Sequence, residues 1–153
     1  MPYPYSEKEN PNVYFTMGTT AENVAKQYSI SRTEQQDFAI YSHQKAFEAQ
    51  SKGNFNDEIV SIGNCSKDSN IRPNSNQEKL DELKLAFDQN GTVTAATSSP
   101  LTDGAAAILV CEEQYAKDNN LEIFAKIIST SVQGCKPDTM GLGPIGASQK
   151  ALE

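Results

Sequence analysis

Small and hydroxyl side chains are concentrated in one stretch of the chain, residues 91–104, with the sequence GTVTAATSSPLTDG. Small residues let a ligand approach the backbone closely. Hydroxyl groups can bond to the amides of a ligand, and four residues here carry them: Thr94, Thr97, Ser98 and Ser99. The apolar run that follows, residues 105–111, predicts a buried strand. The stretch is therefore a candidate binding loop, although its composition also suits an ordinary loop before a core strand.

Three cysteines and one histidine are the other residues that could act as nucleophiles or metal ligands. Cys65, Cys111 and Cys135 are far apart and include no CxxC pair, so they predict reduced thiols rather than a disulfide framework or a zinc site. Cys111 ends an apolar run and is expected in the core. His43 lies inside a predicted helix, far in sequence from any cysteine, which favours a packing or surface role. We expect no metal site.

The composition narrows the class of protein. The 153 residues suffice for one modest domain, but a hydrophobic fraction of 37% is low for that size and favours part of a larger enzyme. A net charge of −7 and no lysine- or arginine-rich block argue against nucleic acid as a partner. No apolar run approaches the length of a membrane span, and the first residues do not resemble a secretory signal. These features predict a soluble, cytoplasmic protein without a membrane partner.

Two segments of the form Thr/Ser-x-x-Glu predict where helices begin, because both side chains of such a capping box bond to free amides of the first turn. Residues 19–22 (TTAE) predict a helix over residues 21–28. Residues 31–34 (SRTE) predict the longest helix, over residues 32–52, ended by Gly53 in a left-handed conformation. Helical spacing predicts a packing face on it made of Phe38, Ala39, Ser42, Ala46 and Ala49.

The rest of the chain predicts a layered α/β fold. Residues 1–12 predict an extended lead-in, rich in proline. The following segments predict strands at 58–62, 105–111 and 123–132 and helices at 79–86, at 112–119 and from about Pro144 onward. Helices thus come first and a strand–helix–strand order follows, which indicates a helix-rich insertion before a piece of an α/β layer.

Several stretches, in the same order and spacing, resemble the thiolase family. They are MGTTAENVAK (17–26), SRTEQQDFA (31–39), NDEIV (56–60), GTVTA with SPLTDGAAA (91–107), and MGLGP (140–144). The resemblance implies a thiolase-like fold fragment of class α/β. It divides the chain into a coenzyme A-binding loop domain (residues 1–90), a return into the N-terminal core (91–121) and the start of the C-terminal core (122–153).

The resemblance also implies an activity. Thiolases are acetyl-CoA acyltransferases or acetyltransferases of fatty acid metabolism, and they form or cleave 3-ketoacyl-CoA by Claisen chemistry. Coenzyme A thioesters are substrates, and no resident cofactor is expected. The family's catalytic groups are two cysteines, one in Cys-x-Gly-Gly-Gly, and the histidine of Gly-His-Pro. Neither motif occurs in this sequence. We therefore expect no catalytic residue in the chain and no activity from it alone.

By the same resemblance, five residues bind coenzyme A. Ala95 and Ser99 line the pantetheine channel, where Ser99 bonds to a pantetheine amide. Phe87 supplies an apolar wall, and Met17 helps to close the acyl pocket. Arg72 corresponds to an arginine near the adenine and phosphate end, and a guanidinium suits both stacking and phosphate pairing.

Two departures from the family pattern leave the acyl chain length open: Thr16 replaces a common histidine, and Pro100 stands where short-chain enzymes have glycine. Expected partners are acyl-CoA substrates, the remaining parts of a thiolase chain and further copies in a homotetramer. Two alternatives remain. The chain could belong to a non-catalytic, thiolase-like protein that binds acyl-CoA or lipid, or it could be a standalone oligomerisation module.

Overall fold

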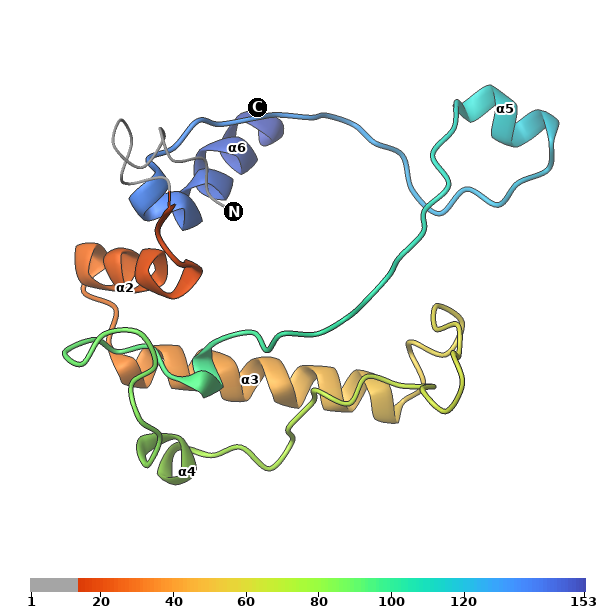
Figure 1. Ribbon diagram of the computed structural model, residues 1–153. Coiled ribbons are helices and arrows are strands. Elements are labelled where there is room, and N and C mark those ends of the chain that lie inside the picture. Colours follow the sequence, from red (N-terminus) through yellow and green to blue (C-terminus); the bar gives the residue numbers. More distant parts are fainter. Residues whose placement is uncertain (1–13) are drawn as a thin grey trace. The chain divides into compact units, whose positions relative to one another are not determined.

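The computed structural model describes residues 14–153, and its regular elements are all helices (Figure 1). The chain divides into two compact units: unit 1 consists of Met1–Pro100 and Lys136–Gly141, and unit 2 of Leu101–Cys135 and Leu142–Glu153. The predicted lead-in at residues 1–12 lies outside the described residues.

Helix α2 (Met17–Tyr28) begins earlier than the sequence predicts. Its N-cap is Thr16, whose hydroxyl accepts a hydrogen bond from the backbone N–H of Thr19 at 3.2 Å. The predicted cap at Thr19 is therefore wrong, because Thr16 has the extended backbone conformation of a cap and supplies the same kind of oxygen one turn earlier. Ser29, in the left-handed region at φ 54°, ends the helix.

Helix α3 (Arg32–Ser51) confirms the second capping box. The Glu34 N–H donates to the Ser31 hydroxyl at 3.2 Å, and the Ser31 N–H donates to the Glu34 carboxylate at 2.7 Å. The hydrogen bonds from the Ser31 side chain and backbone lower the pKa of Glu34, because they stabilise the ionised carboxylate. Gly53 follows the helix with a φ of +74°, as predicted for its termination.

The packing face of α3 is rotated from the predicted one. Gln36 is fully buried, whereas Phe38 is 74% exposed and Ser42 is also exposed. Ala39, Ala46 and Ala49 are partly buried, as predicted. The sequence pattern failed because it assigned Phe38 to the interior from its apolarity, while the buried position is taken by a polar neighbour.

Two short helical segments complete unit 1. Helix α4 (Gln77–Asp81) is shorter than the predicted helix at 79–86, because Leu85 forms a bridge with Thr94 and the Ala86 N–H donates to Val93 O at 3.0 Å. The 3₁₀ helix η2 (Ala95–Thr97) follows that bridge. The predicted strand at 58–62 is reduced to an isolated bridge between Ile62 and Cys65.

Arg32, the first residue of α3, fixes the end of α4. One guanidinium nitrogen, Nη2, donates to the carbonyl oxygens of Leu80 at 2.7 Å, Asp81 at 3.1 Å and Leu83 at 2.8 Å. Carbonyls at and just beyond a helix end need hydrogen-bond donors outside the helix, and a cation there is also favoured by the helix dipole. A single side chain thus ties the 80–83 segment to α3.

Unit 2 contains α5 (Glu113–Asp118) and α6 (Gly143–Leu152), which confirm the helices predicted at 112–119 and near Pro144. The 3₁₀ helix η3 (Pro137–Leu142) precedes α6 in sequence, and all of it except Leu142 belongs to unit 1. Ion pairs from Lys117 and Lys126 stabilise the ionised form of Glu113 and lower its pKa, with the Lys117 hydrogen bond the larger cause.

The predicted strands at 105–111 and 123–132 form no ladder within residues 14–153, and both segments are coil on either side of α5 (Figure 1). Their apolar side chains are exposed: Ile108 is 87%, Phe124 88% and Ile128 84% accessible. Cys111 is exposed as well, so its predicted core position is wrong here. A strand needs a neighbouring strand for its hydrogen bonds, and the described part of this chain supplies none.

We predict that the 153-residue chain on its own self-associates. Uncovered apolar segments with unpaired backbone groups favour pairing with another chain. Static light scattering over a concentration series should show species heavier than the 16.7 kDa chain. A monomer at every concentration that unfolds in one cooperative transition would contradict this.

Candidate functional site

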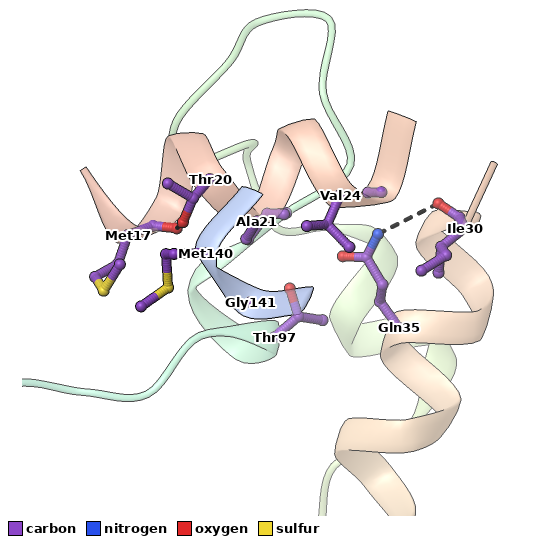
Figure 2. Close-up of a pocket in the computed structure, with 11 residues that line it drawn as sticks. Met17, Thr20, Ala21, Val24, Ile30, Gln35, Thr97, Met140 and Gly141 are labelled. Carbon is purple, nitrogen blue, oxygen red and sulfur yellow. Dashed lines mark hydrogen bonds between the residues drawn. The ribbon is translucent and has the colours of Figure 1, made fainter. Parts of the chain in front are cut away.

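Unit 1 contains an apolar pocket of about 390 Å³. Its walls come from α2, from the start of α3, from residues 93–97 and from the 136–141 segment. The lining residues are Met17, Thr20, Ala21, Val24, Ala25, Ile30, Gln35, Val93, Thr97, Met140 and Gly141. Met17 and Met140 lie at one end of the pocket, and Ile30 and Gln35 lie at the other (Figure 2). Flexible thioethers adapt well to an apolar ligand.

Glu22 of α2 organises the wall that contains Val93. Its carboxylate accepts hydrogen bonds from the backbone N–H of Thr92 (2.9 and 3.1 Å to the two oxygens), from the N–H of Val93 (2.9 Å) and from the Thr92 hydroxyl (3.2 Å). The residue is 9% exposed. A buried carboxylate is tolerated when hydrogen bonds replace its hydration, and these bonds supply that replacement.

Gln35 of α3 extends this contact. Its Nε2 donates to the Thr92 hydroxyl at 2.8 Å, and that hydroxyl donates in turn to Glu22. Thr92 therefore lies between side chains of two helices. The arrangement connects α2, α3 and the turn at residue 92 in one hydrogen-bonded series, which fixes the turn against both helices.

Thr94 continues the ordered loop. It is fully buried, and its backbone oxygen accepts hydrogen bonds from the hydroxyls of Thr97 (3.3 Å) and Ser98 (2.8 Å). The Thr94 N–H donates to the Thr97 hydroxyl at 3.0 Å. Two of the four predicted hydroxyls, those of Thr97 and Ser98, thus hold the loop through the backbone of Thr94, while Ser99 is exposed.

Asn23 ties the 136–141 segment to α2. Its Nδ2 donates to the backbone oxygen of Asp138 at 2.9 Å, across 115 positions of sequence. Gly141 lies close to Val24, with 3.9 Å between the Val24 methyl carbon and the place where a Cβ would stand. Asn23 thereby helps to hold Met140 and Gly141 in the pocket wall.

The five predicted binding residues occupy different places in unit 1. Met17 lines the pocket and is 61% exposed. The ring of Phe87 packs so closely on Gly18 that any Cβ at position 18 would overlap it. Ala95 and Ser99 are exposed, at the start of η2 and just after it. Arg72 is exposed and its backbone N–H donates to His43 Nδ1 at 3.3 Å.

Sequence reasoning missed three residues that shape this region. Glu22 was assigned to a capping box, although its carboxylate contacts the turn at residues 92–93. Asn23 carried no signal beyond the family motif. Met140 lines the pocket with Met17, although 123 positions separate the two, and nothing local in the sequence indicates this contact.

Residues 14–153 contain no group of three His, Cys, Asp or Glu side chains placed to hold a metal ion. Across the same residues, no helix has the length and apolarity needed to cross a membrane. The three cysteines are exposed and form no disulfide there.

Comparison with known sequences identifies related proteins. The family described as "Thiolase, N-terminal domain" matches residues 9–114. A probable acetyl-CoA acyltransferase of Staphylococcus aureus (strain COL) is 44% identical over 148 residues, and an acetyl-CoA acetyltransferase of Shinella zoogloeoides is 45% identical over 147 residues. Each alignment covers 91% of this chain and 38% of the relative, so the chain spans about two fifths of those proteins.

Solved structures give the same result for the fold. The dimeric peroxisomal thiolase of Saccharomyces cerevisiae matches with a TM-score of 0.91 at 34% identity, over 99% of this chain and 41% of that one. Human mitochondrial 3-ketoacyl-CoA thiolase, crystallised with CoA, matches with a TM-score of 0.86 at 36% identity, over 94% and 37%. The predicted thiolase-like fold is confirmed, while the predicted strands are not.

We predict that Asn23→Ala loosens the 136–141 segment, because it removes a hydrogen bond worth about 0.5–1.5 kcal/mol. Hydrogen–deuterium exchange of residues 136–141 should become faster, while exchange in α3 stays unchanged. Gln27→Ala is the matched control, since Gln27 is an exposed amide on the same helix. Equal exchange in the two variants would show that Asn23 does not hold this segment.

Proposed function

This chain belongs to the thiolase family, and we propose that it forms the coenzyme A-binding segment of an acyltransferase that makes or cleaves 3-ketoacyl-CoA. The observation that carries the proposal is the loop at residues 92–99. It is fixed by Glu22 and Thr94, it leaves Ser99 exposed, and it borders an apolar pocket. A rigid loop with one accessible hydroxyl suits the pantetheine arm, whose amides need partners and whose carbons need an apolar wall.

Each predicted binding residue has a role in this proposal. The Ser99 hydroxyl bonds to a pantetheine amide beside Ala95, and Phe87 forms an apolar wall. Met17 closes the acyl end of the pocket, and Arg72 meets the adenine and phosphate end. The acyl group then lies between the two methionine side chains of the pocket.

The domain division follows from the same proposal. Residues 1–90 form the loop domain, residues 91–121 return into the N-terminal core, and residues 122–153 begin the C-terminal core. The remaining parts of the enzyme then cover the exposed apolar segments of unit 2 and provide the nucleophilic cysteine, the proton-transferring cysteine and the histidine. We further propose a homotetramer in the cytoplasm that acts in fatty acid metabolism.

Two relatives support this assignment by their names alone: an acetyl-CoA acyltransferase and a 3-ketoacyl-CoA thiolase that binds CoA. A non-catalytic, thiolase-like protein that binds acyl-CoA or lipid would use the same loop and pocket but would lack the catalytic cysteines. A standalone oligomerisation module would assemble without binding CoA. Thiolysis by the complete protein distinguishes the proposed enzyme from the first alternative, and CoA binding distinguishes it from the second.

Thiolysis of acetoacetyl-CoA by the 153-residue chain alone should not exceed background. Its sequence lacks the family's Gly-His-Pro and Cys-x-Gly-Gly-Gly motifs, and its single histidine, His43, is far in sequence from every cysteine. The assay follows the loss of the 3-ketoacyl-CoA enolate absorbance. Activity that survives replacement of Cys65, Cys111 and Cys135 by serine would refute the proposal that catalysis resides elsewhere.

In the complete enzyme, Ser99→Ala should weaken CoA binding by about 0.5–1.5 kcal/mol, the net value of one hydrogen bond. Isothermal titration calorimetry measures the dissociation constant directly. Ser66→Ala provides the control, because Ser66 is an exposed loop serine outside the proposed site. An unchanged dissociation constant in a folded Ser99→Ala protein would place pantetheine elsewhere.

Arg72→Ala should weaken CoA binding by a similar amount, and the effect should shrink as salt is added, because added ions screen the pairing with phosphate. Lys67→Ala removes the same charge from the same loop and serves as the control. Dephospho-CoA tests the location, since removing the 3′-phosphate should matter less once Arg72 is absent. Salt dependence identical to the wild type would exclude this role for Arg72.

A further inference from the structure

Glu22 is a buried carboxylate that the proposed chemistry does not use. It lies on α2, and within residues 14–153 no basic side chain forms an ion pair with it. Its hydrogen-bond donors are two successive backbone amides and one hydroxyl, all from residues 92 and 93. Successive N–H groups that converge on one anion form charge-assisted hydrogen bonds, which are stronger than neutral ones.

The carboxylate of Glu22 does not cap its own helix, α2. The N-cap of α2 is Thr16, so Glu22 lies beyond the first turn and its carboxylate is not required by the free amides there. The carboxylate instead approaches the 91–93 turn so closely that a Cβ at Gly91 would overlap it. The absence of a side chain at position 91 permits this contact.

The contact leads directly to the loop that carries the proposed binding residues. Val93 lines the pocket, and Thr94 holds Thr97 and Ser98 through its backbone oxygen. Ser99 is the next residue. Hydrogen bonds among Thr94, Thr97 and Ser98 thus connect residues 92–93 to Ser99. The position of residues 92–93 can therefore determine the position of Ser99.

We infer that Glu22 is a positioning residue for coenzyme A binding. It holds residues 92–93 so that the Ser99 hydroxyl lies within hydrogen-bonding reach of the pantetheine amide. This inference rests on the proposed function of the loop. Glu22 touches neither the substrate nor a reacting atom, and it acts through the backbone of the loop. Thr92 and Gln35 complete the contact from the side of α3.

Two variants disconnect the contact by different routes. Glu22→Gln keeps the size of the side chain but removes its charge and one acceptor oxygen, so the remaining bonds are weaker. Gly91→Ala leaves residue 22 a charged glutamate, but the added Cβ overlaps its carboxylate and displaces it from the turn. The matched controls are Glu48→Gln, an exposed glutamate on α3, and Gly134→Ala, which lies outside the 91–104 stretch and where the added Cβ meets nothing within 4 Å.

The first measurement is hydrogen–deuterium exchange at the amides of Thr92 and Val93 in the complete protein. Both disconnecting variants should raise exchange there by about tenfold or more, as expected when a charge-assisted hydrogen bond is lost. Neither control should change it. Exchange that is unchanged in both disconnecting variants would overturn the inference, whatever CoA does.

The second measurement is the dissociation constant of CoA for Glu22→Gln, Ser99→Ala and the double variant. Each single change should weaken binding by about three- to tenfold. If Glu22 acts through Ser99, the double variant should be weakened by clearly less than the product of the two single effects, because a displaced hydroxyl has little left to lose. If the fold-change in the dissociation constant of the double variant equals the product of the two single fold-changes, Glu22 supports the fold without positioning Ser99.

The two proposals fail in different ways. If Ser99→Ala alone leaves CoA affinity unchanged, the proposed function of the loop is wrong, and the positioning role falls with it even if the exchange data show the contact. If Ser99→Ala weakens binding but combines with Glu22→Gln as independent changes do, the proposed function stands and the positioning role is overturned.

Discussion

The ordered part of unit 1 depends on a buried charge being matched by backbone amides. A carboxylate removed from water is strongly destabilising unless hydrogen bonds replace its hydration. Glu22 meets this requirement with the N–H groups of Thr92 and Val93, which come from a loop 70 residues later in the chain. The Glu22 carboxylate and the two N–H groups satisfy each other's hydrogen bonds only when α2 and the loop lie together. This contact therefore determines how α2 and the loop are arranged, and it forms one wall of the pocket.

Local signals in the sequence predicted local structure well. The capping box at Ser31 and Glu34 was confirmed because both partners lie within one helical turn. The start of α2 was missed because three threonines compete as caps and the glutamate that favoured Thr19 is engaged in a tertiary contact. Gln36 illustrates the same limit: it is completely buried although it is polar, and no periodicity of apolar residues reports this.

Strand formation marks the other limit of sequence reasoning. Residues 105–111 and 123–132 have strand composition, yet they remain coil here because a ladder requires neighbours. The chain spans about two fifths of the length of the relatives it matches. For the site, the family motif led to Met17, Phe87, Ala95 and Ser99. Met140 and Asn23 emerged from contacts between segments more than 100 residues apart.

We propose that the loop at residues 94–99 binds the pantetheine arm of coenzyme A. Hydrogen–deuterium exchange on the complete protein, with and without saturating CoA, tests whether this loop is the binding site. Addition of CoA should slow exchange across residues 94–99 and leave residues 58–66 unaffected. Unchanged exchange at residues 94–99 while CoA is demonstrably bound would show that the pantetheine arm lies elsewhere.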